Sequence, residues 1–147
     1  DGSGTIEAGD IMMVDNHYYI GLSDRTNIEG AEQIIGILNK YGYTGSTVNL
    51  REVLHLKTGL SYLENNLLVI CGEFKSDPIF SKFDHIEIPE EESYAANCIW
   101  VNDSVLIPTG YPLAKEKISS SGYNVIEVDV SEYKKLDGGL SCLSLRY

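Results

Sequence analysis

The sequence predicts an α/β protein that is built from repeated strand–strand–helix–strand units. Three observations support this prediction: short apolar runs recur along the chain, a polar turn precedes each run and a glycine ends it, and segments with helical spacing follow. Short strands that alternate with helices are typical of α/β proteins. Repetition of one unit favours a radial or stacked arrangement. An ordinary three-layer α/β domain is the alternative.

The predicted strands belong to three related units and a closing strand. Each unit opens on a polar turn that runs into an apolar strand and reaches a glycine, over residues 15–21, 65–72 and 102–110. A second strand ends each unit, at residues 47–50, 85–88 and 125–130. The closing strand is the apolar segment that contains Cys142.

Two of the units contain a clear helical pattern. In the first, apolar residues at helical spacing predict a helix that is capped by Thr26 or Asn27 and runs through Tyr41. Gly42 follows at the position of a helix-ending residue. In the third unit, a helix is predicted from Pro112 to Gly122, with the proline in its first turn and the glycine at its end.

The size and charge of the chain limit its partners. At 147 residues it has the size of one ordinary domain, and we expect residues 1–147 to form it without a separate second domain. The formal net charge of −11 argues against nucleic acid and anionic membranes, because both bind basic patches. It suits a cationic small molecule, and it also suits plain solubility. No run approaches the ~20 apolar residues of a membrane span, and no signal-peptide pattern is present at the start.

The cysteines favour a reducing compartment. Cys71, Cys98 and Cys142 form an odd set without a CxxC pair or a histidine at metal-binding spacing. This pattern fits the cytoplasm, with neither a disulfide framework nor a zinc site. The first residues, Asp1 to Gly4, resemble the interior of a longer chain.

Cys142 is the candidate nucleophile. It follows Gly138 and Gly139, which let the backbone take a positive φ or approach a ligand closely. A thiol attacks as the thiolate, which needs a nearby cation or donor dipoles. The alternative is a small buried hydrophobic residue, the usual role of a cysteine in an apolar strand. Cys71 and Cys98 fit that alternative.

Three further residues have suitable chemistry for a site around such a thiol. His55, between two leucines, can exchange a proton near neutral pH, and a core histidine is the alternative. Glu7, ahead of an apolar strand, can orient an imidazole or simply be a solvated turn residue. Arg25, between a strand and a helix start, can bind a carboxylate with two hydrogen bonds or form a surface salt bridge.

Four segments together resemble the dimethylarginine dimethylaminohydrolase family. They are Glu-Ala-Gly-Asp at residues 7–10, Ile-Gly-Leu-Ser-Asp-Arg-Thr-Asn at 20–27, Leu-His-Leu-Lys-Thr-Gly at 54–59 and Asp-Gly-Gly-Leu-Ser-Cys-Leu-Ser-Leu at 137–145. The segment at residues 90–101, with Tyr-Ala-Ala-Asn-Cys-Ile-Trp-Val, is similar too. The resemblance runs through nearly the whole chain and is closest to bacterial members.

This resemblance implies a fold. The family belongs to the guanidine-modifying (pentein) superfamily, whose fold is a five-bladed α/β propeller of repeated ββαβ units with the active site on the central axis. The resemblance places this chain in the C-terminal portion, with about three of the five blades. The N-terminal portion supplies substrate-binding carboxylates and a flexible lid in the family, and neither maps onto this sequence.

The resemblance also implies a reaction, the hydrolysis of Nω-methylated arginine to citrulline and a methylamine or dimethylamine. Cys142 would attack the guanidinium carbon to form a covalent amidino-thioether. His55 would protonate the leaving amine and then activate water, and Glu7 would hold His55 in position. No metal or organic cofactor is implied.

Substrate contacts and partners follow from the same resemblance. Arg25 would bind the α-carboxylate, and Leu136 and Ser141 would offer backbone or hydroxyl contacts beside the nucleophile. The expected partners are the small-molecule substrate and either a second copy of the chain or the missing N-terminal half. The alternatives are an arginine or agmatine deiminase, which releases ammonia, and an inactive fragment that binds a partner chain or an arginine-like ligand.

Overall fold

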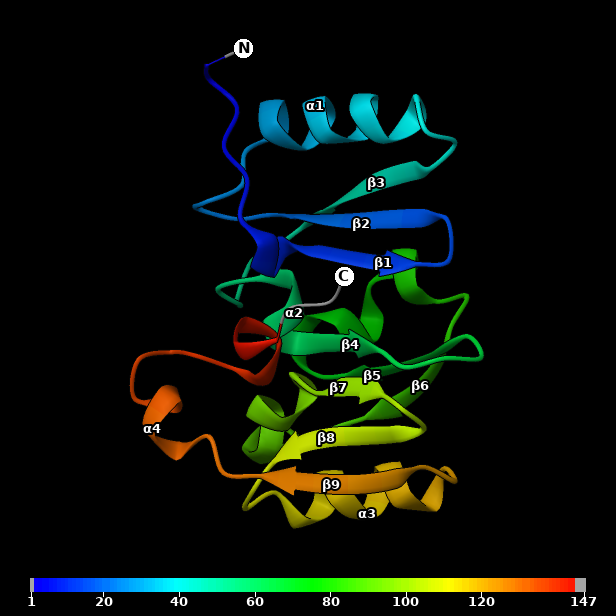
Figure 1. Cartoon of the computed structure of the whole chain (residues 1–147), viewed down its shortest axis with the longest axis vertical. Coiled ribbons are helices and arrows are strands. Elements are labelled where there is room, and N and C mark those ends of the chain that lie inside the picture. Colours follow the sequence, from blue (N-terminus) through cyan, green and yellow to red (C-terminus); the bar gives the residue numbers. More distant parts are fainter. Residues whose placement is uncertain (1, 145–147) are drawn as a thin grey trace. The chain divides into compact units, whose positions relative to one another are not determined.

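The computed structural model describes residues 2–144, which form three small mixed sheets of three strands each (Figure 1). The chain divides into two compact units, Asp1–Lys57 and Thr58–Tyr147. The first unit contains one sheet and the second contains two. The prediction of an α/β protein with a repeated unit is therefore confirmed. The placement of the blades around one axis, and the membership of all residues in a single domain, stay predictions.

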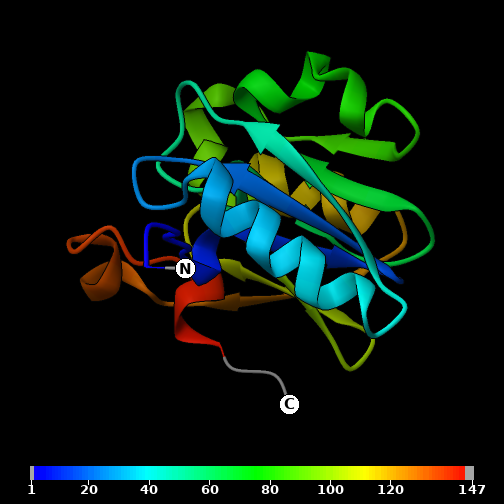
Figure 2. The same ribbon diagram turned by 90° about the horizontal axis from the view of Figure 1, so that it is seen from above.

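The first unit is a ββαβ element preceded by a short 3-10 helix, η1 (Ala8–Asp10). Strand β1 (Ile11–Val14) pairs antiparallel with β2 (His17–Leu22), and β2 pairs parallel with β3 (Thr44–Asn49). Helix α1 (Ile28–Asn39) makes the crossover between the parallel strands and packs against both of them (Figure 2). This arrangement brings the end of η1 and the turn after β2 to the same end of the sheet.

Local sequence signals account for both ends of α1. Asn27 is the cap, since its side-chain oxygen accepts a hydrogen bond from the Gly30 N–H at 2.8 Å. Gly42 follows the helix with a φ of 85°, a conformation that glycine adopts without the penalty of a side chain. Of the two predicted caps, the structure therefore selects Asn27, while Thr26 has another role described below.

The second unit repeats the strand pattern twice. Strand β5 lies between an antiparallel β4 and a parallel β6, and β8 lies between an antiparallel β7 and a parallel β9. The elements in chain order are α2 (Leu56–Gly59), which crosses from the first unit, β4 (Leu60–Tyr62), β5 (Leu67–Ile70), η2 (Gly72–Ser76), η3 (Pro78–Phe80), β6 (Asp84–Glu87), η4 (Glu90–Ala96), β7 (Ile99–Val101), β8 (Ser104–Pro108), α3 (Pro112–Ser120), β9 (Asn124–Val128), α4 (Ser131–Lys134) and η5 (Leu140–Leu143).

The polar turns that were predicted to open the three strand–strand–helix–strand repeats are hairpin turns inside these repeats. Each joins the first and second strands of a sheet and contains a non-glycine residue with positive φ: Asp15, Asn65, Asn66, Asn102 and Asp103. Asn and Asp tolerate this conformation better than other residues with a side chain. Each of the three repeats therefore begins one strand earlier than its polar turn.

The second unit has a continuous hydrophobic core. It contains residues from both sheets and from α3, namely Leu63, Val69, Cys71, Ile86, Ile88, Ala95, Ala96, Cys98, Val105, Ile107, Ala114 and Ile118. Helix α3 is capped from outside its own sequence, because the buried carboxylate of Glu92 accepts hydrogen bonds from the Leu113 and Ala114 N–H groups at 3.2 and 2.7 Å. A carboxylate at a helix N-terminus is favoured by the helix dipole.

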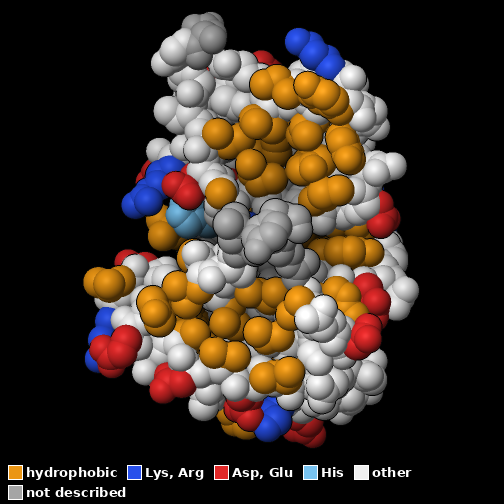
Figure 3. Space-filling model, in the orientation of Figure 1, with side chains coloured by type: hydrophobic (Ala, Val, Ile, Leu, Met, Phe, Trp, Pro, Cys, Tyr) orange, Lys and Arg blue, Asp and Glu red, His pale blue; other side chains and the backbone are white. Residues whose placement is uncertain are grey.

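Some large hydrophobic side chains remain at the surface. In the first unit these are Ile6, Met13, Ile28, Ile37, Tyr41 and Leu54. Figure 3 shows hydrophobic side chains gathered on the visible face of this unit. Within residues 2–144, no helix has the length and apolar character that crossing a membrane requires.

Candidate active site

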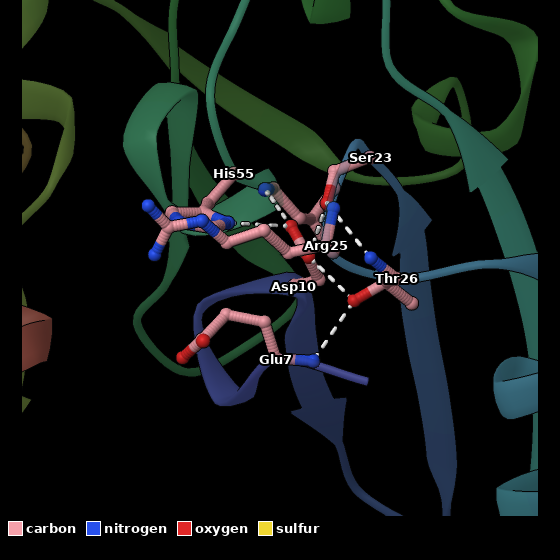
Figure 4. Close-up of polar contacts among 7 residues, drawn as sticks. Glu7, Asp10, Ser23, Arg25, Thr26 and His55 are labelled. Carbon is pink, nitrogen blue, oxygen red and sulfur yellow. Dashed lines mark hydrogen bonds and ion pairs between the residues drawn. The ribbon is translucent and has the colours of Figure 1, made fainter. Parts of the chain in front are cut away.

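The carboxylate of Asp10 lies at the centre of a polar cluster in the first unit (Figure 4). Asp10 is fully buried at the end of η1. Its Oδ2 accepts hydrogen bonds from Ser23 Oγ at 2.7 Å and Thr26 Oγ1 at 2.6 Å. Its Oδ1 accepts one from the Leu56 backbone N–H at 3.1 Å. Burial of a carboxylate without partners is strongly unfavourable, so these donors allow Asp10 to stay in the interior.

His55 contacts this carboxylate directly. It lies just before α2, and its Nδ1 is 3.1 Å from Asp10 Oδ1. The side chain is 14% exposed, so the ring is largely enclosed but still reachable. Gly9 makes the position of the ring possible, since a Cβ on Gly9 would come within 3.0 Å of His55 Cγ. Because Nδ1 contacts Asp10, Nε2 is the ring nitrogen that can exchange a proton with a substrate or water.

Arg25 lies in a tight turn between β2 and α1. Ser23 and Thr26 close the turn through reciprocal backbone hydrogen bonds. The Arg25 N–H donates to Ser23 Oγ at 3.1 Å. The Arg25 side chain is exposed, which suits a residue that binds an anionic group from solution.

Glu7, which the resemblance predicts to hold His55 in position, is half-buried ahead of η1. Its N–H donates to Thr26 Oγ1 at 2.9 Å and its carbonyl accepts from the Asp10 N–H at 3.0 Å. The carboxylate that hydrogen-bonds to His55 Nδ1 is that of Asp10. The side chains of Glu7 and Arg25 both extend toward the left of Figure 4. A direct role for the Glu7 carboxylate stays a prediction.

Cys142 lies in η5 of the second unit, and its side chain is exposed. The backbone before it is held by two side chains from the η4 region. Asn97 Oδ1 accepts a hydrogen bond from the Ser141 N–H at 2.9 Å, and the Tyr94 hydroxyl donates to the Gly138 carbonyl at 2.6 Å. The thiol is thus presented to solvent on a backbone that is fixed at two points. The prediction of a strand around Cys142 was wrong for Leu140–Leu143, and Leu145 lies outside the described residues.

Gly138 and Gly139, which precede Cys142, were predicted to allow a positive φ or a close approach to a ligand. The structure gives them another role. Positive φ occurs at Asp137, at 58°, and not at Gly138 or Gly139. A Cβ on Gly139 would overlap the side-chain amide of Asn97, and a Cβ on Gly138 would lie 3.1 Å from the Tyr133 carbonyl oxygen. Close packing against other groups of the same unit is therefore what requires these glycines.

The two other predicted contacts in this segment differ in exposure. Leu136 follows α4 and is 84% exposed, so its side chain is open to a ligand. Ser141 is half-buried, and its N–H is already bound to Asn97. Leu136, Ser141 and Cys142 thus share one segment of the second unit, while His55, Glu7 and Arg25 share the polar cluster of the first.

Burial makes the thiols of Cys71 and Cys98 unsuitable as nucleophiles. Burial, with a smaller contribution from Glu90, raises the pKa of the Cys71 thiol to about 11. Burial raises the pKa of the Cys98 thiol to about 12. Such thiols are protonated at neutral pH and are poor nucleophiles. Residues 2–144 contain no group of three or more His, Cys, Asp or Glu side chains placed to hold a metal ion.

Sequence reasoning assigned no role to Asp10, Asn97 or Tyr94. Asp10 ends the Glu-Ala-Gly-Asp segment, so a carboxylate just before an apolar strand was as visible there as at Glu7. Tyr94 and Asn97 contact a segment 44 residues later in the chain, and no local pattern indicates such a contact.

A family model for arginine deiminase matches residues 1–87, more than half of the chain. Among curated proteins, a dimethylarginine dimethylaminohydrolase from Pseudomonas aeruginosa is 65% identical over 147 residues. The match covers 100% of this chain and 58% of that protein. A protein of the same description from Streptomyces coelicolor is 28% identical over 143 residues, covering 97% of this chain and 55% of its own length.

Solved structures give the same result. A cysteine-to-serine variant of the Pseudomonas aeruginosa enzyme, complexed with citrulline, superposes with a TM-score of 0.97 at 64% identity, covering 100% of this chain and 58% of that one. An amidinotransferase from Microseira wollei shares the fold, with a TM-score of 0.82 at 18% identity over 94% of this chain and 46% of that one. The chain thus spans about half the length of these proteins, from 46% to 58%. It belongs to the arginine deiminase family of the guanidine-modifying superfamily, in the dimethylarginine dimethylaminohydrolase branch.

Proposed function

We propose that this chain carries the nucleophile and the acid/base residue of a hydrolase that converts Nω-methylated arginines to citrulline and a methylamine. The observation that carries the proposal is 65% identity, over the whole chain, to a dimethylarginine dimethylaminohydrolase. The local geometry supports it. The thiol of Cys142 is exposed on a fixed backbone, and the imidazole of His55 is held through Nδ1.

In the proposed reaction, the Cys142 thiolate attacks the central carbon of the substrate guanidinium. His55 gives a proton to the methylated nitrogen, the C–N bond breaks, and a methylamine leaves. The product of this half-reaction is a positively charged amidino-thioether on Cys142. Neutral His55 then takes a proton from water, whose oxygen adds to the same carbon. The C–S bond then breaks, the added hydroxyl loses its proton to solvent, and citrulline leaves as the Cys142 thiolate is restored.

The remaining predicted residues act on position and binding. Arg25 binds the substrate α-carboxylate from its exposed turn, and Leu136 lines the approach to the thiol. Ser141 contributes backbone or hydroxyl contacts, and Glu7 supports His55 or the substrate cation. The acidic character of the chain, with a net charge of −11, favours a cationic substrate. The five-bladed propeller, of which this chain would form about three blades, would be completed by sequence outside this chain or by a partner.

The test is citrulline production from Nω,Nω-dimethylarginine and from arginine, assayed in parallel. The chain is assayed alone and after addition of the N-terminal part of the Pseudomonas aeruginosa relative that it does not cover. We expect citrulline from dimethylarginine and none with Cys142→Ser. Arg25→Ala should raise KM with little change in kcat. Absence of product in both preparations would contradict the proposal.

A second reaction, arginine deimination, is favoured by one observation. The family model that matches residues 1–87 is that of arginine deiminase. That reaction uses the same thiol and imidazole but releases ammonia. Citrulline and ammonia from unmethylated arginine, with none from dimethylarginine, would decide for it.

A further inference from the structure

We infer that Asp10 is the positioning residue that sets both the ring of His55 and the turn of Arg25. The inference rests on the proposed function and names the group that organises its first-unit residues. One buried carboxylate reaches both of them. Its Oδ1 faces the His55 imidazole and its Oδ2 faces Ser23, whose hydroxyl also holds the Arg25 backbone (Figure 4).

The first part of the argument concerns the imidazole. Asp10 Oδ1 lies 3.1 Å both from His55 Nδ1 and from the N–H of the next residue, Leu56. The carboxylate therefore fixes the ring and the backbone that carries it. A carboxylate oxygen that accepts from Nδ1 selects the tautomer with hydrogen on that nitrogen. The lone pair of neutral His55 is then on Nε2, where it can accept the proton of water.

Gly9 provides a second constraint on the position of the ring. A Cβ at Gly9 would lie 3.0 Å from Cγ of His55 and 3.3 Å from Cβ and Cδ2. Contacts this close are rarely tolerated, so the ring rests on the backbone of η1 itself. Asp10 and Gly9 are neighbours in this 3-10 helix, so one short element positions His55 by a hydrogen bond and by packing.

The second part concerns the arginine turn. The Ser23 hydroxyl donates to Asp10 Oδ2 at 2.7 Å and accepts from the N–H groups of Arg25 and Thr26 at 3.1 and 3.2 Å. Thr26 Oγ1 donates to the same oxygen at 2.6 Å. Asp10 thus orients the Ser23 hydroxyl, which holds the Arg25 backbone. The Asp10 carboxylate is therefore connected to two groups of the proposed site. One is the His55 imidazole, which exchanges protons, and the other is Arg25, which binds the carboxylate of the substrate.

The first experiment needs no turnover. Nitrogen-15 NMR of the imidazole in this chain, with His55→Gln to identify its signals, reports which ring nitrogen carries the hydrogen. We expect Nδ1–H in the wild type and a loss of that preference in Asp10→Asn, because the amide can present N–H groups to the ring. An unchanged tautomer in Asp10→Asn would overturn the inference. Because this readout is independent of catalysis, absence of citrulline in the wild type would contradict only the proposed function.

The second experiment separates the two parts by kinetics, in whichever preparation turns over dimethylarginine. Ser23→Ala keeps the Asp10–His55 contact, and we expect KM to rise on the order of tenfold with kcat nearly unchanged. Gly9→Ala tilts the ring, and we expect kcat to fall on the order of 10²-fold at similar KM. Asp10→Asn should change both. Gly36→Ala, in open space on α1, is the control and should change neither. Equal effects of Ser23→Ala and Gly9→Ala on the two constants would contradict the division of roles.

Discussion

Two buried polar side chains position the candidate site residues. Asp10 contacts the residues around His55 and Arg25, and Asn97 contacts the segment of Cys142. Asp10 is 0% exposed and organises the His55 and Arg25 cluster, while Asn97 is 7% exposed and accepts from the N–H beside Cys142. Both lie on or next to short 3-10 helices instead of on strands. Buried polar groups with satisfied hydrogen bonds restrict the backbone to one arrangement, which suits residues that must present reacting atoms.

Asn97→Ala tests this role at the nucleophile segment. Removal of the amide leaves the Ser141 N–H without its acceptor and opens space beside Gly139. We expect a loss of about 1–3 kcal/mol in unfolding free energy and a lower rate of citrulline formation. Thermal unfolding and the citrulline assay measure these effects. Asn124→Ala removes an exposed asparagine of β9 and serves as the matched control. A rate equal to that of this control would show that Asn97 does not position the thiol.

Thiol reactivity should distinguish the three cysteines. The pKa values of about 11 and about 12 keep Cys71 and Cys98 protonated, so that roughly one in 1,000 Cys71 thiols is ionised at pH 8. An aromatic disulfide reagent at pH 8 should therefore modify Cys142 alone in the folded chain and all three thiols in denaturant. Reactivity at the buried thiols should appear only as the pH rises toward those pKa values. Fast reaction of the Cys142→Ser variant would contradict this.

At the scale of single residues, the sequence indicated which side chains have suitable chemistry but not which contacts hold them in place. Cys142, His55 and Arg25 could be nominated because their chemistry is visible in the sequence. The contacts that hold them join residues 45 and 44 positions apart, Asp10 with His55 and Asn97 with Ser141. Such pairs depend on the register of whole sheets. The resemblance pointed to Glu7 as the group that holds His55, and this role stays a prediction. The contact of Asp10 with Nδ1 was not predicted.

At the scale of elements, α1 offers a matched pair of glycines. A Cβ on Gly30 would overlap the Thr5 carbonyl, whereas a Cβ on Gly36 would meet nothing within 4 Å. We expect Gly30→Ala to destabilise the chain by about 1–3 kcal/mol, because the Thr5 segment must move away from the helix. Gly36→Ala should stabilise it by up to about 1 kcal/mol through helix propensity. Denaturant titration measures both changes, and effects of the same sign would contradict this account.

Elements with strong local signals were predicted, and elements without them were not. Asn27, Gly42, Pro112 and Gly122 mark the ends of α1 and α3 where the sequence places them. The apolar character of the segment around Cys142 indicated a strand, but Leu140–Leu143 form a 3-10 helix. Its conformation is imposed by hydrogen bonds to Tyr94 and Asn97, which override the local preference.

At the scale of the whole molecule, the chain covers 58% of its Pseudomonas aeruginosa relative, and large hydrophobic side chains are exposed. Such surfaces favour association. We expect sedimentation of the chain alone to show self-association, and addition of the uncovered N-terminal part of that relative to replace it with a defined complex. A stable monomer that does not bind this part would contradict the expectation. A Met13→Lys, Ile37→Lys double variant provides the control, since it removes exposed apolar surface without touching the polar cluster.

The order of strands in the three sheets has a consequence for how the chain acquires its structure. Within the described residues 2–144, each sheet is formed by three strands that follow one another in the sequence. The connections within each sheet are local in sequence, the longest being the crossover from β2 to β3 that carries α1, so the entropy lost on closure is limited. Local pairing of this kind is associated with fast folding. We therefore expect folding to begin independently in each sheet, with the contacts of Asp10 and Asn97, which join more distant segments, forming last.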